Sequence, residues 1–216
     1  AFVPTAVPRP SRPCSTRDSG PGDSQNYYRT VPRQFLDYCA GQRDWLLDFI
    51  EALVAIESPS DDPTAVNRCG AELASRLQAL GGEVTRLLPS TPGLPTVALA
   101  KVGDHLRASF GQGSRQILLL GHFDTVWPIG QLKSMPLKRE DGRIYGPGIF
   151  DMKAGIGLAT LATRAVLDAG GLGQCRVVML WTSDEEIGST TSRALIEAEA
   201  QQSDAVAHVC RVESTT

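Results

Sequence analysis

A histidine and several carboxylates stand at the ends of apolar segments in the second half of this 216-residue chain. His122 and Asp124 follow the segment "ILLL" at 117–120, and "DEE" at 184–186 follows "VVML" at 177–180. Asp151 precedes a third segment, rich in small apolar residues. Imidazole and carboxylate groups are the usual oxygen and nitrogen ligands of zinc in proteins. These loops therefore indicate a metal-dependent reaction.

The spacing within each loop has a physical logic. In His122-x-Asp124, an extended backbone turns both side chains to the same side, so Asp124 can accept the proton of the ring nitrogen that does not bind metal. Glu185 and Glu186 are neighbours and must point differently. One can bind metal while the other acts as a general base toward water. Bound cations would also compensate the repulsion among the clustered acids, with Asp184 left in a supporting role.

These loops need a sheet that brings them to one edge. We predict strands at 82–88, 95–102, 117–120, 175–183 and 204–212, and helices at 43–56, 61–82, 152–169 and 189–201. This alternation is typical of a layered α/β fold. Because ligands bind beyond the carboxyl ends of strands in open α/β sheets, the loop residues should meet there. Glu213 follows the last strand and joins the same set.

Several local features carry more specific expectations. Asp62 should cap the second helix and Ser189 the last one, since both types accept N-terminal N–H groups. Asp141-Gly142 predicts a hairpin turn. Lys153 is interpreted as a surface residue, and His105 as a residue of a polar loop. Residues 1–34 are rich in Pro, Ser and Arg, which predicts a disordered or artefactual tail before the domain at 35–216.

Composition excludes some classes of protein. The net charge of −3 gives no support for nucleic-acid binding, and no apolar run approaches the length of a membrane span. Five cysteines, an odd number without a C-x-x-C pair, disfavour a disulfide framework and a thiolate zinc site. Reduced thiols in a cytoplasmic protein are the simplest interpretation.

Three motifs together resemble a known family. "GHFDTVW", "YGPGIFDMKAGI" and "TSDEEIGS", in this order, are similar to those of the aminoacylase/carboxypeptidase family of dinuclear zinc metallopeptidases, in its glutamate carboxypeptidase-like branch. The resemblance covers about residues 44–213. It implies an α/β fold: a three-layer catalytic domain with a mixed, largely parallel sheet, truncated here before the lid or dimerisation domain.

The resemblance also implies roles for single residues. His122 would be a terminal ligand of one zinc, and Asp151 would bridge two zincs through a side chain that precedes a cis peptide bond. Glu185 would be the general base, and Glu186 would bind the second zinc. Asp124 would orient His122. The alternatives for these residues are a hydrogen-bonded loop histidine, a helix-capping aspartate and a solvated acidic loop.

Two further ligands follow from the resemblance. Glu213 would be a metal ligand, although Ser214 stands where the family usually has proline. The family takes a last histidine ligand from a segment beyond its lid domain. Neither His105 nor His208 is an obvious substitute for it.

The expected function is zinc-dependent hydrolysis of an amide bond beside a free carboxylate, with a C-terminal glutamate or an N-acyl amino acid as substrate. Two Zn²⁺ are expected, and Co²⁺ or Mn²⁺ would suit similar ligands. A full-length form would be a homodimer that acts on small peptides. The alternatives are a truncated, inactive fragment that at most binds metal, and a desuccinylase or acetyl-amino-acid deacylase of the same family.

Overall fold

The structure, a computed structural model, describes residues 32–91, 96–99 and 101–209. Most of the predicted N-terminal tail and the candidate ligand Glu213 lie outside these ranges. The first described helix, α1, runs from Arg33 to Gly41.

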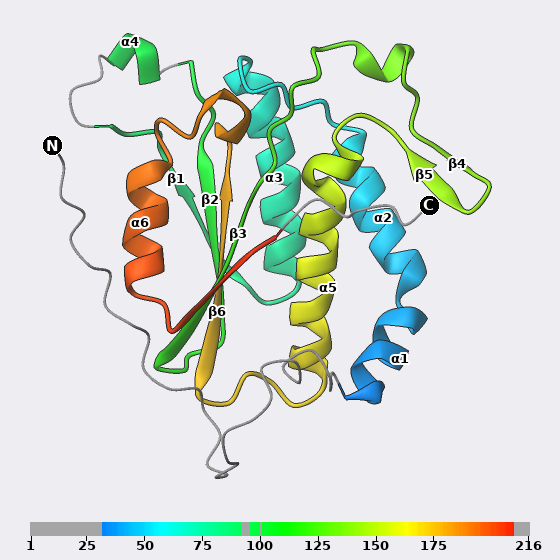
Figure 1. Cartoon of the computed structure of the whole chain (residues 1–216), viewed down its shortest axis with the longest axis vertical. Coiled ribbons are helices and arrows are strands. Elements are labelled where there is room, and N and C mark those ends of the chain that lie inside the picture. Colours follow the sequence, from blue (N-terminus) through cyan, green and yellow to red (C-terminus); the bar gives the residue numbers. More distant parts are fainter. Residues whose placement is uncertain (1–31, 92–95, 100, 210–216) are drawn as a thin grey trace, which may run out of the picture.

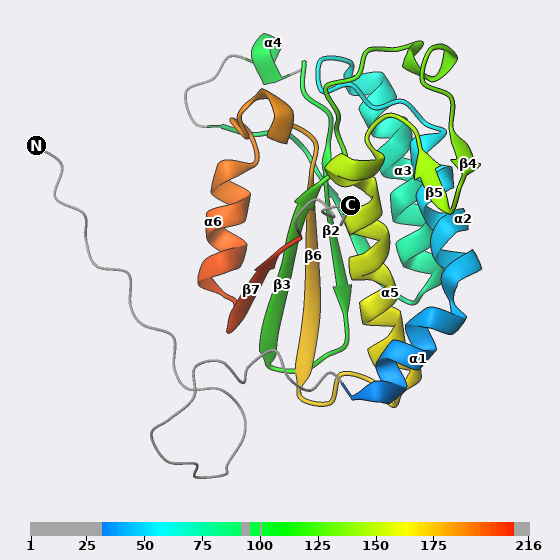
Figure 2. The same ribbon diagram turned by 45° about the vertical axis from the view of Figure 1, so that its right-hand side comes forward.

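A five-stranded mixed sheet forms the centre of the fold (Figures 1 and 2). β3 runs parallel to both β6 and β7, whereas β2 is antiparallel to β1 and β6. The pairing of β3 with β6 continues to His122 opposite Thr182, so both strands end at the same edge of the sheet. In spatial order the strands are β1 (Glu83–Leu87), β2 (His105–Phe110), β6 (Cys175–Thr182), β3 (Arg115–His122) and β7 (Ala205–His208).

Helices cover both faces of this sheet. One face carries α1, α2 (Arg43–Val54), α3 (Pro63–Ala79) and α5 (Ala154–Asp168), and the other face carries α6 (Arg193–Gln201) (Figures 1 and 2). The main core joins α2 and α3 to the sheet, with Phe49, Leu73 and Trp181 all fully buried. The predicted three-layer α/β fold is confirmed.

Local sequence signals explain several element boundaries. Asp62 caps α3 as predicted, because its side chain accepts a hydrogen bond from the N–H of Ala65 at 2.9 Å. β4 (Lys138–Glu140) and β5 (Arg143–Tyr145) form the predicted hairpin. Its turn residues, Asp141 and Gly142, have φ angles of 50° and 74°, the left-handed values that a tight two-residue turn requires.

One strand prediction was wrong, and one strand was missed. The segment predicted as a strand at 95–102 contains the short helix α4 (Thr96–Leu99). The antiparallel strand β2 was not predicted, and His105 is its first residue instead of a loop residue. Its alternation is visible in "HLRASF": Leu106 is buried on one face, while Arg107 pairs with Glu199 of α6 on the other.

Among the helices of the described residues, none combines the length and apolar character needed to cross a membrane.

Candidate metal centre

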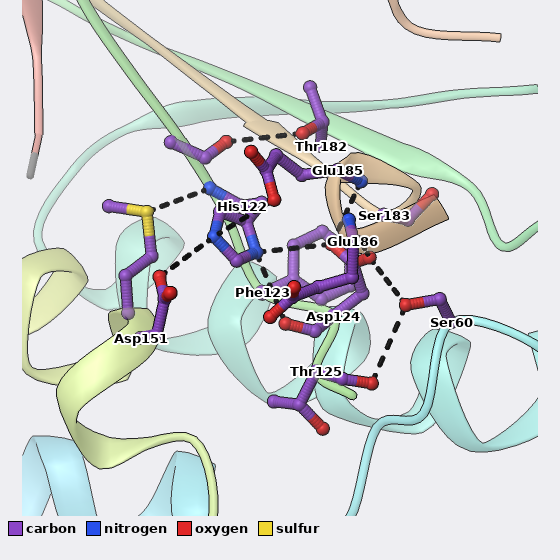
Figure 3. Close-up of polar contacts among 12 residues, drawn as sticks. Ser60, His122, Phe123, Asp124, Thr125, Asp151, Thr182, Ser183, Glu185 and Glu186 are labelled. Carbon is purple, nitrogen blue, oxygen red and sulfur yellow. Dashed lines mark hydrogen bonds and ion pairs between the residues drawn. The ribbon is translucent and has the colours of Figure 1, made fainter. Parts of the chain in front are cut away.

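His122 lies at the carboxyl end of β3 with its ring buried (Figure 3). Its Nδ1 atom is 3.3 Å from Oδ1 of Asp124, and its Nε2 atom is 3.2 Å from Oδ1 of Asp151. Nε2 also lies 3.7 Å from Oε2 of Glu185. Each ring nitrogen therefore faces a carboxylate: Nδ1 faces the buried Asp124, and Nε2 faces the half-exposed Asp151.

Asp124 is fully buried and connects three parts of the site. It accepts a hydrogen bond from the hydroxyl of Ser60 at 2.7 Å and from the backbone N–H groups of Glu185 and Glu186 at 3.4 and 3.2 Å. Asp124 thus lies beside His122, where the proposed orienting role needs it, and it also holds the turn at Glu185 and Glu186. No sequence pattern indicated Ser60, which follows α2 in a loop.

Asp151 lies in the turn at Ile149–Lys153, directly before α5. The Asp151–Met152 peptide bond is cis, as the family resemblance implies. The sulfur of Met152 accepts the N–H of His122 at 3.3 Å (Figure 3). A Cβ on Gly121 would come within 2.6 Å of the Met152 methyl carbon, so the absence of a side chain there allows this contact.

Lys153 is buried, which corrects the prediction of a surface residue. Its side chain is 1% exposed, and Nζ donates hydrogen bonds to the carbonyl oxygens of Leu53 at 3.0 Å and Ile56 at 2.9 Å. Burial lowers the pKa of this ammonium group. The interaction ties the Asp151 turn to the C-terminal end of α2, where unpaired carbonyls attract a cation.

Glu185 and Glu186 occupy a short 3₁₀ turn, Glu185–Ile187, just after β6. Ligand atoms of His122, Asp151 and Glu186 all lie within 4.8 Å of one another. The Glu185 side chain is half exposed and faces the same space from above the histidine (Figure 3). The ends of β3 and β6 and the start of α5 thus bring together the candidate residues that the structure describes.

Asp184 holds this turn from the other side. Its buried carboxylate accepts hydrogen bonds from the backbone N–H groups of Thr191 at 2.7 Å and Ser192 at 3.3 Å. The prediction that Ser189 caps α6 was wrong: Ser192 is the N-cap residue and makes no side-chain cap, while Asp184 binds the two N–H groups just before the helix. Ser189 instead has a φ of 53° in the loop before the helix.

The charges of the site favour a cation. Burial lowers the pKa of His122, but the hydrogen bond and charge of Asp124, together with the charges of Glu185 and Asp151, outweigh it and raise that pKa to about 9. Burial raises the pKa of Glu186, with further contributions from neighbouring carboxylates. One imidazole among four carboxylates is a donor set that fits a divalent ion, whose charge offsets their repulsion.

A cavity of about 270 Å³ opens beside Glu186. Val126 and Ile187, which are 64% and 51% exposed, give it an apolar rim, and Asp61 adds a carboxylate. The complete lining consists of Pro59, Ser60, Asp61, Thr125, Val126, Pro128, Glu186 and Ile187. One of the candidate ligands, Glu186, is thus part of the wall of this cavity.

The fold and this cluster define a three-layer α/β protein with a histidine–carboxylate site at the carboxyl ends of its strands. Residues 118–216 match the model of peptidase family M20/M25/M40. The chain is 34% identical over 158 residues to carboxypeptidase G2 of Pseudomonas sp. (strain RS-16), covering 73% of this chain and 36% of that protein. It is 30% identical over 171 residues to the succinyl-diaminopimelate desuccinylase of Parvibaculum lavamentivorans, covering 76% and 41%. The family match and these two relatives confirm the resemblance drawn from the motifs, over part of the chain.

Solved structures agree in fold. Human carnosine dipeptidase 1 superimposes with a TM-score of 0.65 at 22% identity, over 84% of this chain and 41% of that one. An M20 family metallo-carboxypeptidase from Sulfolobus solfataricus, Sso-CP2, gives 0.58 at 22% identity, over 76% and 36%. The chain therefore spans about two fifths or less of the relatives it matches.

Proposed function

We propose that this chain supplies the catalytic machinery of a zinc-dependent hydrolase that cleaves an amide bond beside a free carboxylate. The observation that carries the proposal is the approach of His122, Asp151 and Glu186 to within 4.8 Å, with Glu185 beside them. The names of two relatives, a carboxypeptidase and a desuccinylase, support this class of reaction.

In this proposal His122, Asp151 and Glu186 hold the metal, and Glu213 is a further ligand outside the described residues. Two Zn²⁺ are proposed, with Co²⁺ or Mn²⁺ as substitutes that suit the same donors. When bound, zinc would polarise the scissile carbonyl and make water more acidic. Asp124 keeps the His122 ring oriented through Nδ1, as outer carboxylates commonly do for ligating histidines.

Glu185 is the proposed general base. Its carboxylate is half exposed and lies 3.7 Å from Nε2 of His122, so it faces the same space as the ligand atoms while remaining accessible to water. It takes the proton of the attacking water and passes it to the nitrogen of the leaving amine. A carboxylate with these contacts is better placed for proton transfer than Asp124, which is fully buried.

The cavity beside Glu186 is the proposed site for the acyl part of the substrate. Its rim is apolar, and its lining holds Asp61 and Glu186 but no lysine or arginine. An uncharged acyl group is therefore preferred over a succinyl group, and the substrate carboxylate must find its cationic partner elsewhere. Substrates of the proposed type are C-terminal glutamates or N-acyl amino acids. Dimerisation of a longer form and a cytoplasmic location stay predictions.

The test uses the purified 216-residue chain. Zn²⁺ titration of the wild type and of Glu185→Gln should give the same affinity, while hydrolysis of an N-acyl glutamate with an apolar acyl group should be lost only in Glu185→Gln. Glu197→Gln, an exposed acid on α6, is the matched control. Full turnover by Glu185→Gln would contradict its assignment as general base. Zinc binding without any hydrolysis by the wild type would favour the alternative of a metal-binding fragment.

A further inference from the structure

Asp184 is a buried carboxylate without an ion-pair partner among the described residues. A buried charge is costly unless several donors compensate it. Three donors reach its Oδ2 atom: the N–H of Thr191 at 2.7 Å, the hydroxyl of Thr191 at 2.8 Å and the N–H of Ser192 at 3.3 Å. The backbone oxygen of Asp184 also accepts the N–H of Ser189 at 2.7 Å. Asp184 thereby closes the loop that carries Glu185 and Glu186.

His105 continues this hydrogen-bond network from β2. It is fully buried, and the proposed chemistry does not use it. The backbone N–H of Ser183 donates to Nδ1 of His105 at 3.2 Å, which places the ring proton on Nε2. Nε2 then donates to the hydroxyl oxygen of Thr191 at 3.0 Å. The Thr191 oxygen accepts this hydrogen bond, and the Thr191 hydroxyl hydrogen is donated to the carboxylate of Asp184.

These contacts join Ser183, His105, Thr191 and Asp184 in one continuous hydrogen-bond network. The Ser183 hydroxyl donates to the carbonyl oxygen of Gly103 at 2.6 Å and also lies 3.0 Å from Nδ1 of His105. The chain of donors runs from the Ser183 N–H through His105 and Thr191 to Asp184. It begins and ends on two adjacent residues at the end of β6, so it braces the peptide immediately before Glu185.

The opposite side of the turn is held by a second buried carboxylate. Asp124 accepts the N–H groups of Glu185 and Glu186 (Figure 3). Residues 183, 185 and 186 thus each donate their backbone N–H to a buried side chain. The Thr191 hydroxyl is the link between the imidazole and the Asp184 carboxylate.

We propose that His105, Thr191 and Asp184 form a positioning relay that sets the place of Glu185 and Glu186. The inference rests on the proposed function, in which these two glutamates act as base and metal ligand. His105 and Thr191 are positioning residues, because their hydrogen bonds reach Ser183 and Asp184 and not the candidate ligand atoms.

The first experiment needs no metal. Thr191→Val removes the hydroxyl at nearly constant volume, and Thr191→Ser keeps it. In Thr191→Val, amide hydrogen exchange at residues 185 and 186 should accelerate about tenfold, which corresponds to the net strength of a typical hydrogen bond. Thr191→Ser should restore the wild-type rate, and exchange at Val178 within β6 should not change. Unchanged exchange at 185 and 186 in Thr191→Val would overturn the relay.

The second experiment measures the link to the metal ligand. Thr191→Val should weaken Zn²⁺ binding about tenfold in the wild-type background and have no further effect in Glu186→Gln, because the coupling acts through Glu186. Faster exchange with unchanged zinc affinity would overturn the positioning role. A wild type that binds no zinc would instead contradict the proposed function. The hydrogen-exchange data would still show whether the relay positions residues 185 and 186.

If Thr191→Val does not fold, a second variant, His105→Asn, tests the same relay. His105→Asn keeps an acceptor near the Ser183 N–H but is too short to reach Thr191. It should produce the same local increase in exchange at residues 185 and 186, without acceleration at Val178. An increase at all amides alike would overturn the inference, because it would show a general loss of stability.

Discussion

Nε2 of His122 lies 3.2 Å from Oδ1 of Asp151, although 29 positions separate the two residues in the chain. The approach follows from the fold, since β3 ends where α5 begins. The same two atoms border the space that the proposed metal would fill. The donors are thus brought together by the sheet and by the turn before α5.

Asp124→Asn tests the orienting carboxylate. It keeps the size of the side chain but removes the charge that faces Nδ1 of His122. We expect Zn²⁺ affinity to fall about 10- to 100-fold, the usual effect of losing an outer carboxylate. Competition with a chromophoric chelator measures it. Asp61→Asn, an exposed acid in the neighbouring cavity, is the control and should change affinity by less than about threefold, because solvent screens its charge. Equal effects of the two variants would argue against a special role for Asp124.

Lys153→Ala tests the buried ammonium group. The variant loses two hydrogen bonds to the carbonyls of Leu53 and Ile56 and leaves a cavity under α2. We expect the free energy of unfolding to fall by about 3 kcal/mol, measured by urea denaturation. The exposed Lys101→Ala should change it by less than about 0.5 kcal/mol. A Lys153→Ala protein as stable as Lys101→Ala would show that the buried contacts contribute nothing net.

Gly121→Ala tests the close contact between β3 and the Asp151 turn. The new methyl group would come within 2.6 Å of the methyl carbon of Met152 and 2.8 Å of the Trp181 ring. Relief of this overlap should cost about 1–3 kcal/mol of stability. Gly41→Ala, at the end of α1, meets no atom within 4 Å and should be neutral or slightly stabilising. Thermal unfolding of both variants makes the comparison, and equal melting temperatures would refute the predicted overlap.

The stability of the protein should depend on pH through His105. Burial lowers the pKa of this histidine in the folded state, although the charges of Asp184, Asp124 and Asp104 oppose the effect. The unfolded chain takes up the proton near pH 6.5 while the folded protein stays neutral, so the unfolded state binds more protons below that pH. Stability is therefore lost as the pH falls below about 6.5, by at most about 1.4 kcal/mol per pH unit from this group.

Carboxylates also titrate at low pH, so a difference between variants isolates the histidine. Urea unfolding at about pH 7.5 and 5.5 should show a smaller loss for His105→Asn than for the wild type. His208→Asn, exposed on β7, should keep the wild-type dependence. The same loss in all three proteins would exclude His105 as the source.

The sequence predicted the residues of the candidate site better than their surroundings. The loops after β3 and β6 and the position of Asp151 could be predicted, because apolar runs precede the two loops and a small-residue helix follows Asp151. Lys153 could not, since its place under α2 depends on tertiary packing that no local pattern records. β2 was missed although it alternates, because its polar residues His105 and Arg107 are typical of a loop, and their partners on the Thr191 loop and on α6 are known only from the tertiary structure. Ser60 and Thr191 act through single hydroxyl groups, which leave no trace in hydrophobic periodicity.

The parallel pairing of β3 with β6 has a consequence for folding kinetics. Leu118 meets Val178 only after the whole crossover through α5 has been folded back, so the chain loses much entropy before this contact is formed. His122 stands opposite Thr182 at the end of that register, one step before the turn that carries the two glutamates. The donor set is complete only when this late pairing is complete. The rate of zinc binding during refolding would therefore report the rate at which β3 pairs with β6. Circular dichroism of the helices would report this step poorly.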